Sequence, residues 1–416
     1  MTDTTGTLTT RGGRGQIAVG GPPRPLAPSG KGPVARSGAR SPARPSAGSR
    51  DDPRPWPGGF VLLVSLIAVL NLIGLVMVLS ASSVESLRQY GSPWYYFERQ
   101  ALWLILGTGA FVLAARTDYR RWRRVGPFAL LVAVLLLFAV LVPGVGINVS
   151  GSSRWLGLGS WRIQPSEFAK VALVLFAADV ADRRAHRIAD WRYSMGPILV
   201  IFSLLAVLVM VQPDMGTTMV LACVVLALLF VAGSPLVPMA GVLGLGGILA
   251  LLMAVAAPYR WRRMMAFIHP FADASNTGYQ SAQGLVALGS GRLAGVGIGA
   301  SRASWGFLPN QHTDFIFAIV GEETGLVGSL LLVGLFVAFA VLGVRAACRA
   351  PDRFGALVAA GITAWIVGQA VVNIGAVVGL LPVTGVPLPF ISFGGSSLII
   401  AMGGVGILAN VAKQAR

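Results

Sequence analysis

The sequence predicts an all-α protein that crosses a membrane many times. Hydrophobic residues make up 55% of the 416 residues, charged residues make up only 12%, and the mean hydropathy is +0.72. A soluble core could not hide that much apolar surface. In addition, the chain contains repeated apolar runs of about the 20 residues that a membrane-spanning helix needs.

Ten runs are long enough to be spans. They cover approximately residues 60–80, 98–115, 127–143, 165–181, 195–211, 215–232, 236–257, 314–342, 355–381 and 392–411. An even number of spans places both termini on the same side. The longest interruption, residues 258–313, is predicted to be a large loop between spans 7 and 8.

The positive charges predict the orientation of these spans. If the N-terminus is cytoplasmic, three residues fall in the short outer loops, namely Arg88, Arg154 and Arg162. The inner loops and the C-terminal tail then carry Arg116, Arg120, Arg121, Arg123, Arg124, Arg183, Arg184, Arg187, Arg192, Arg345, Arg349, Arg353, Lys413 and Arg416. Positive charge accumulates on the cytoplasmic side of membrane proteins, so we expect both termini to be cytoplasmic and the 258–313 loop to be extracytoplasmic.

Two domains are predicted from the change in composition near residue 58. Residues 1–58 are rich in Gly, Pro, Ser, Thr and Arg and cannot bury enough apolar surface to fold, so we expect a disordered basic cytoplasmic tail. Residues 59–416 form the ten-helix membrane domain. The net charge of +17 lies mostly in clusters between apolar runs, so we do not expect a nucleic-acid partner.

Ionisable residues inside spans are costly, and each is therefore a candidate for function. Glu167 and Lys170 are three residues apart in the fourth run and share one helix face. They can form an internal salt bridge or line a cavity for a charged headgroup. The two readings are compatible.

Three further candidates lie near the ends of spans. Asp214, in the tight Gln212–Gly216 hairpin, can cap the next helix. Arg99 can extend toward lipid headgroups. Arg154 is suited to phosphate oxygens because its guanidinium donates two parallel hydrogen bonds, although a single loop arginine is usually just solvated.

Asp314 opens the eighth run, where water meets hydrocarbon. An acid at a helix N-terminus is favoured by the helix dipole and can be a cap, or it can be a base held at the lipid surface. A broken, Pro- and Gly-rich stretch, residues 381–397, is tolerated at membrane depth only beside protein or a wet cavity. Together these features predict a cavity that faces outward.

No nucleotide-binding loop or dinucleotide fingerprint is present, so the sequence shows no site that could drive transport by nucleotide hydrolysis. His312 lacks a Cys or His partner at ligand spacing, and we therefore predict no metal site.

Several motifs together resemble one family. They are Arg154-Trp155, Gln164-Pro-Ser-Glu-Phe-Ala-Lys170, Gln212-Pro-Asp-Met-Gly-Thr217, Gly278-Tyr-Gln280, Leu308-Pro309, His312-Thr-Asp-Phe-Ile-Phe317, Gly321-Glu322-Glu323 and Pro387-Leu-Pro-Phe-Ile-Ser-Phe-Gly-Gly-Ser-Ser397. The chain from about residue 60 to 411 resembles the SEDS proteins, the FtsW/RodA group of membrane glycosyltransferases. The Gly-Glu-Glu motif and the C-terminal motif look more like the division branch than the elongation branch.

The resemblance implies polymerisation of lipid II into peptidoglycan glycan strands at the outer leaflet of the bacterial cytoplasmic membrane, at the division septum. It places the catalytic acid at Asp314. It implies substrate-binding roles for Glu167, Lys170, Arg154, Asp214, Arg263, Arg99, His312 and Ser396. It also implies work beside a class B penicillin-binding protein and other divisome proteins.

In this reaction a sugar hydroxyl displaces polyprenyl diphosphate, so one base and cationic stabilisation of the leaving group suffice. A divalent cation, Mg²⁺ or Mn²⁺, is neither required nor excluded. Two rival functions remain open. One is a lipid II flippase, in which Glu167, Lys170 and Asp214 line a translocation path, and the other is a non-catalytic divisome scaffold.

Overall fold

The structure is a computed structural model that describes residues 57–149, 152–158, 161–188, 190–256, 261, 267–272, 276 and 278–415. The predicted tail up to residue 56 and the candidate Arg263 lie outside these described residues.

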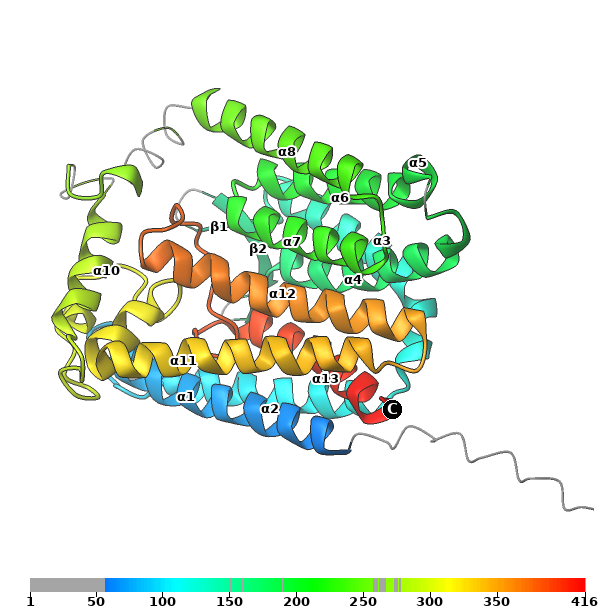
Figure 1. The fold of residues 1–416 in the computed structure, drawn as a ribbon. Helices are drawn as coiled ribbons and strands as arrows, with labels where there is room; N and C mark the ends of the chain where they lie inside the picture. Colours follow the sequence, from blue (N-terminus) through cyan, green and yellow to red (C-terminus); the bar gives the residue numbers. More distant parts are fainter. Residues whose placement is uncertain are drawn as a thin grey trace, which may run out of the picture. The chain divides into compact units, whose positions relative to one another are not determined.

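Ten long helices among the described residues coincide with the ten predicted spans (Figure 1). They are α1 (Pro57–Tyr90), α2 (Tyr95–Arg116), α3 (Tyr119–Leu141), α4 (Pro165–Arg183), α6 (Gly196–Val211), α7 (Met215–Val231), α8 (Leu236–Ala256), α11 (Ile316–Cys348), α12 (Arg353–Val377) and α13 (Gly395–Gln414). A four-residue helix, α5 (Trp191–Ser194), precedes α6. In the described part of the chain, five helices are long and apolar enough to cross a membrane, and three shorter apolar helices accompany them. The chain is a multi-pass membrane protein.

The predicted span ends are wrong at several places because an apolar run marks contact with lipid, whereas a helix continues as far as its backbone is supported. Helix α1 runs well past residue 80 to Tyr90, and the polar Ser82 and Ser86 in this extension are fully buried. Helix α11 begins at Ile316, two residues after the predicted start, and continues to Cys348.

Two loops that are predicted to be extracytoplasmic contain regular structure that the apolar pattern did not predict. A three-stranded antiparallel sheet, β1 (Ile147–Val149), β2 (Ser152–Leu158) and β3 (Trp161–Ile163), lies between α3 and α4. Ile147 faces Trp155 across the first pair of strands, and Leu156 faces Ile163 across the second. The large loop contains α10 (Tyr279–Ser290) and the short 3₁₀ helix η2 (Ala303–Trp305). The spans remain all-α, as predicted.

The large loop is bonded to a break in α11. Gly325 has a φ of 69°, and a Cβ there would lie 2.4 Å from the backbone nitrogen of Gly295, so only glycine allows this approach. The loop supplies the hydrogen bonds that the break would otherwise leave unmade. Val296 N–H donates to the Glu322 carbonyl at 3.0 Å, and the Arg292 carbonyl accepts from Leu326 N–H at 2.9 Å. This part of the loop is therefore fixed to the helix that follows Asp314.

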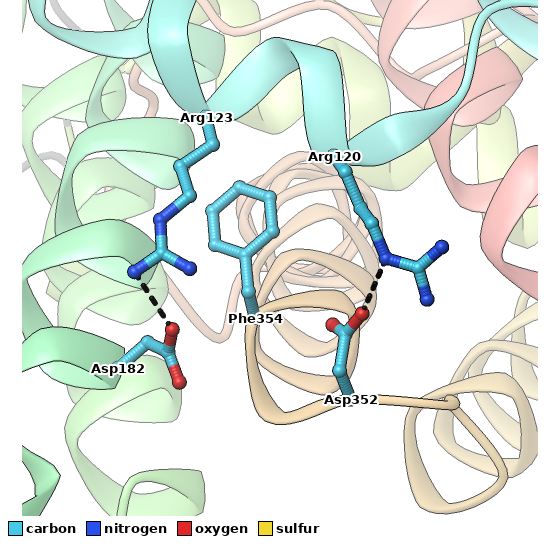
Figure 2. Close-up of a pocket in the computed structure, with 5 residues that line it drawn as sticks. All are labelled: Arg120, Arg123, Asp182, Asp352 and Phe354. Carbon is cyan, nitrogen blue, oxygen red and sulfur yellow. Dashed lines mark hydrogen bonds and ion pairs between the residues drawn. The ribbon is translucent and has the colours of Figure 1, made fainter.

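The opposite end of the bundle, near the C-terminus, holds a group of ion pairs (Figures 1 and 2). Arg120 pairs with Asp352 at 2.9 Å, and Arg123 pairs with Asp182 at 2.9 Å. Together with Phe354 these residues line a cavity of about 210 Å³. The pairs join the ends of α3, α4 and α12, where many of the predicted cytoplasmic arginines gather.

Helix α12 occupies the middle of the bundle, where it contacts α4, α7, α11 and α13. Its Trp365 is completely buried. Because α12 contacts so many helices, polar side chains on it can reach segments that are distant in the sequence.

Candidate functional site

Asp314 lies just before α11 and is half-buried. The N-cap position of the helix is Phe315, which makes no side-chain capping hydrogen bond. Asp314 is therefore not the N-cap residue of α11. Its place at the entrance to the helix is compatible with the alternative reading, a base held at the surface.

The backbone around Asp314 is held by the broken stretch that precedes α13 and by a side chain of α12. Three successive carbonyls accept hydrogen bonds. The His312 carbonyl accepts from Phe393 N–H at 2.9 Å, the Thr313 carbonyl from the Ser392 hydroxyl at 2.5 Å, and the Asp314 carbonyl from Asn373 Nδ2 at 2.8 Å. This segment cannot drift without breaking all three bonds. The broken stretch is non-helical from residue 378 to 394, and its second part is buried at residues 388–392.

Asp314 and Arg154 converge on Gly385, a residue of the broken stretch. A Cβ built on Gly385 would lie 3.5 Å from Asp314 Oδ2 and 4.0 Å from Arg154 Nη1. Both charged atoms therefore lie within about 4 Å of a single point that glycine leaves unoccupied. This convergence brings an acid and a guanidinium together from segments that are far apart in the sequence.

Arg154 is fixed in place by the hairpin between α6 and α7. It lies on β2, and its Nε donates to the Gln212 carbonyl at 2.9 Å while its Nη2 donates to the Pro213 carbonyl. The expectation that a lone loop arginine is merely solvated is wrong here. Two of its nitrogens position the side chain, and Nη1 is directed toward Gly385.

Asp214 caps α7, as predicted. Its Oδ1 accepts from Thr217 N–H at 3.1 Å, and its Oδ2 accepts from the Thr217 hydroxyl at 2.9 Å and from Gln164 Nε2 at 3.2 Å. The side chain is buried, and three hydrogen bonds to two residues engage its oxygens. These contacts hold the hairpin that in turn holds Arg154. A direct role of Asp214 in substrate binding stays a prediction.

Glu167 and Lys170 form the expected salt bridge, 2.7 Å long, with both side chains almost completely buried. Lys170 Nζ also donates to Gln369 Oε1 at 2.6 Å, and the Ser397 hydroxyl donates to Glu167 Oε2 at 3.1 Å. The pair thus connects α4 to α12 and α13. This geometry favours the internal salt bridge over a cavity lining, and the predicted role in substrate binding stays untested.

The remaining candidates lie around this centre. Arg99, near the start of α2, stacks over the Tyr95 ring at 4.7 Å. Ser396 opens α13, where its hydroxyl accepts from Gln164 N–H at 3.2 Å. The His312 ring packs against Tyr96, with 4.6 Å between the ring centroids. Roles in substrate binding for all three stay predictions.

Three contributing residues were missed at the sequence level: Gln369, Asn373 and Ser397. Trp365, Gln369 and Asn373 follow one another at intervals of four residues along one face of α12, and the Trp365 indole N–H donates to Gln369 at 3.0 Å. None of the three missed residues is ionisable, so charge within a span does not mark them. Amides at helical spacing are the signal that would have indicated this face.

Among the residues that the structure describes, no group of three His, Cys, Asp or Glu side chains could hold a metal ion. Arg154 brings a positive charge close to Asp314.

A pH dependence follows from His312, which lies outside the spanning helices. Burial lowers the pKa of His312 from 6.5 to about 4, so the ring is neutral when the protein is folded at neutral pH. The unfolded chain takes up a proton near pH 6.5. The contribution of neutral His312 to the free energy of unfolding is therefore complete above about pH 6.5. It is lost as the pH falls to about 4, and the total loss is up to about 3 kcal/mol. We expect the thermal unfolding midpoint in detergent to fall across this window, and to fall less in His312→Phe.

The matched control is His186→Phe, because His186 is exposed. Its unfolding midpoint should depend on pH as that of the unaltered chain does. If the unfolding midpoint of His312→Phe depends on pH as strongly as that of the unaltered chain, the attribution of this pH dependence to His312 is contradicted.

Gly385→Ala is expected to lower activity more than stability. A methyl group there would occupy the space between Asp314 and Arg154, and the φ of 73° adds a strain of about 1 kcal/mol for a non-glycine residue. Gly379→Ala is the control, since Gly379 has a φ of 76° but its Cβ would meet only the Leu285 side chain, at 3.7 Å. Both variants should unfold at similar temperatures, and only Gly385→Ala should lower the rate of the catalysed reaction, by at least about tenfold. Equal reaction rates in the two variants would contradict the placement of the site beside Gly385.

A comparison with models of known protein families shows to which family the chain belongs. Residues 61–416 match the model of the FtsW/RodA/SpoVE family, described as a cell cycle protein. The chain belongs to this family. The SEDS resemblance predicted from the motifs is therefore confirmed.

Individual members of the family are similar over most of their length. A probable peptidoglycan glycosyltransferase FtsW of Geobacter metallireducens is 39% identical over 85% of this chain and 94% of that protein. The stage V sporulation protein E of Bacillus subtilis is also 39% identical, over 86% of this chain and 97% of its own. Relatives from two branches are thus equally similar.

Two solved structures share the fold. One, from work on the structural coordination of polymerization and crosslinking by a peptidoglycan synthase complex, has a TM-score of 0.69 at 28% identity and covers 85% of this chain and 97% of that chain. The rod shape determining protein RodA of Thermus thermophilus has a TM-score of 0.63 at 28% identity, with 85% and 96% covered. The predicted polytopic SEDS fold is confirmed.

Proposed function

We propose that this chain is a peptidoglycan glycosyltransferase that polymerises lipid II, with Asp314 as the general base. The observation that carries the proposal is the convergence of Asp314 Oδ2 and Arg154 Nη1 on Gly385, in a chain that belongs to a family whose members are named peptidoglycan glycosyltransferases. A base and a cation at one point are the two groups that displacement of a diphosphate needs.

In this mechanism Asp314 Oδ2 accepts the proton of the acceptor sugar hydroxyl. The hydroxyl oxygen then forms a bond to the anomeric carbon of the donor while the bond from that carbon to the diphosphate oxygen breaks. Polyprenyl diphosphate leaves with the electron pair, and the anomeric configuration inverts. Arg154 Nη1 stabilises the negative charge on the departing diphosphate. Asp314 afterwards passes its proton to solvent.

Buried polar residues keep the groups of this site in place. Asp214 holds the hairpin whose carbonyls position Arg154, and the pair of Glu167 and Lys170 holds α4 against α12. Ordered supports of this kind matter because a misplacement of about 1 Å can cost about a hundredfold in rate.

The site lies at the extracytoplasmic end of the protein in the proposed orientation. The arginine-rich ends of α3, α4 and α12 lie together at the other end, beside the C-terminus, which supports placing both termini and the tail of residues 1–58 in the cytoplasm (Figure 1). Residues 59–416 then form the catalytic membrane domain, with the 258–313 loop outside.

We place the protein at the division septum, working beside a class B penicillin-binding protein and other divisome proteins. A relative of the same fold belongs to a peptidoglycan synthase complex that coordinates polymerisation and crosslinking, which supports such a partner. The division role is supported by relatives named FtsW.

Polymerisation in detergent tests the proposal. The purified full chain, alone and with a class B transpeptidase, is given labelled lipid II, and the products are separated by length on a gel. We expect glycan strands from the unaltered chain and none from Asp314→Ala, while the two proteins have the same unfolding midpoint.

Each rival function predicts a different result in this assay. A flippase moves lipid II across a membrane and forms no glycosidic bond, so it makes no polymer in detergent. A scaffold is indifferent to Asp314→Ala, so the products are the same with and without the substitution. Either result would overturn the proposed function.

A further inference from the structure

Asn373 lies on α12, one helical turn beyond Gln369, and its side chain is almost completely buried. Its amide nitrogen donates two hydrogen bonds to two separate segments. One, of 2.8 Å, goes to the backbone carbonyl of Asp314, and the other, of 2.7 Å, goes to the carbonyl of Val386. A single side chain therefore connects the proposed base to the residue that follows Gly385.

The chemistry of these contacts limits which residue can make them. Both partners are carbonyl oxygens, which only accept, so the amide must present its nitrogen to them. Both hydrogens of the amide are used. Aspartate of the same size has no hydrogen to donate, serine has one, and glutamine is longer by a methylene group.

The two carbonyls that Asn373 bonds lie on opposite sides of the proposed site. One belongs to Asp314, and the other belongs to the residue after Gly385, toward which Asp314 Oδ2 and Arg154 Nη1 converge. Asn373 sets how far apart the backbones on the two sides of this space lie. Gln369 supports the neighbouring Pro387 carbonyl in the same manner, at 2.9 Å, but it also belongs to the buried ion pair.

We propose that Asn373 is a positioning residue for glycosyl transfer, holding Asp314 at a fixed distance from the turn at Gly385. This inference rests on the proposed function and adds a residue that acts through Asp314 without touching substrate. If the clamp is lost, Asp314 stays close to the site but not at the attacking distance, so the rate of the chemical step falls and substrate affinity does not.

The chain offers a matched control in Asn410, on α13 at the other end of the bundle. Asn410 is also buried, its Oδ1 accepts from Tyr119 N–H at 2.9 Å, and its Nδ2 donates to the Ala115 carbonyl at 2.8 Å. It resembles Asn373 in burial and in having two hydrogen bonds to the main chain. It differs in accepting one of these two bonds, in accepting a further bond from Gln414 Nε2 at 2.9 Å, and in its distance from the proposed site.

The experiment compares Asn373→Ala and Asn410→Ala in the lipid II polymerisation assay, with the full chain and its transpeptidase partner. Both variants should lower the unfolding midpoint. Asn373→Ala should lower kcat about 10- to 100-fold with KM changed less than about threefold, and Asn410→Ala should leave both constants as they are. If Asn373→Ala does not accumulate, Asn373→Ser, which keeps one donor, is measured instead and should lose less of kcat.

A pH profile adds a readout that a purely structural role would not move. If Asn373 holds Asp314 in place, its loss changes the surroundings of the Asp314 carboxylate, and the pKa of a carboxyl group depends on its burial and its neighbours. The acidic limb of kcat/KM should therefore move in Asn373→Ala and stay in place in Asn410→Ala.

The outcomes separate this inference from the proposed function. A kcat and an acidic limb in the Asn373 variants equal to those of the Asn410 variants would overturn the positioning role while polymerisation by the unaltered chain stands. If the unaltered chain makes no polymer, or Asp314→Asn polymerises at full rate, the proposed function falls, and the role of Asn373 falls with it.

Discussion

Replacing Asp314 with asparagine is expected to slow polymerisation about 10²- to 10⁴-fold, the range that a positioned general base contributes. Asparagine fills the same volume but cannot take the acceptor proton. The three backbone bonds to His312, Thr313 and Asp314 do not involve the carboxylate, so the fold should be unchanged. The rate of strand formation and the unfolding midpoint check this result.

Two further variants test whether the loss of rate in Asp314→Asn comes from the missing base. Asp314→Glu keeps the base but moves it by one methylene group, so it should retain more activity than Asp314→Asn. Asp190→Asn is the control, because Asp190 is exposed and only caps the short helix α5. A loss of rate in Asp190→Asn equal to that of Asp314→Asn would mean that the loss has no connection with the site.

Replacing Lys170 with methionine should have the largest effect on stability, about 3 to 5 kcal/mol. Lys170 is fully buried, and its removal leaves the carboxylate of Glu167 buried without its cation and takes away one of the two donors to Gln369 Oε1, the other being the Trp365 indole N–H. We expect the variant to accumulate poorly and to unfold at a much lower temperature in detergent.

The double variant Glu167→Gln with Lys170→Met tests why the loss occurs. It removes both charges, so much of the stability should return. Activity of the stable double variant then separates the two readings of the pair. An active double variant supports an internal salt bridge, and an inactive one supports the predicted role in substrate binding. Lys170→Met with unchanged stability would contradict the buried geometry.

The spans could be predicted because the cost of exposing polar groups to hydrocarbon leaves a long apolar run for each of them. Their ends could not. Helix α1 continues through polar residues to Tyr90 because Ser82 and Ser86 pack inside the protein. The break at Gly325 was not visible either, since its hydrogen-bond partners come from residues 292–297, which only the folded chain brings near.

The sequence pointed to the charged candidates of the site but not to its uncharged amides or its geometry. Asp314, Glu167 and Lys170 stand out because charge near hydrocarbon is rare. That Arg154 faces Asp314 across Gly385 depends on how β2, the hairpin at Gln212 and the broken stretch pack together, and no local pattern carries that information. Asn373 was missed because an uncharged amide costs less in a span than a charge does.

The most direct test of the account is a measurement of where the glycan is made. The full chain is reconstituted into vesicles whose outer surface corresponds to the extracytoplasmic side, lipid II and the partner transpeptidase are supplied, and a glycan-cleaving muramidase is added from outside. The account predicts strands that the enzyme digests completely and that do not form with Asp314→Asn. Strands protected inside the vesicles, or strands made equally well by Asp314→Asn, would contradict it.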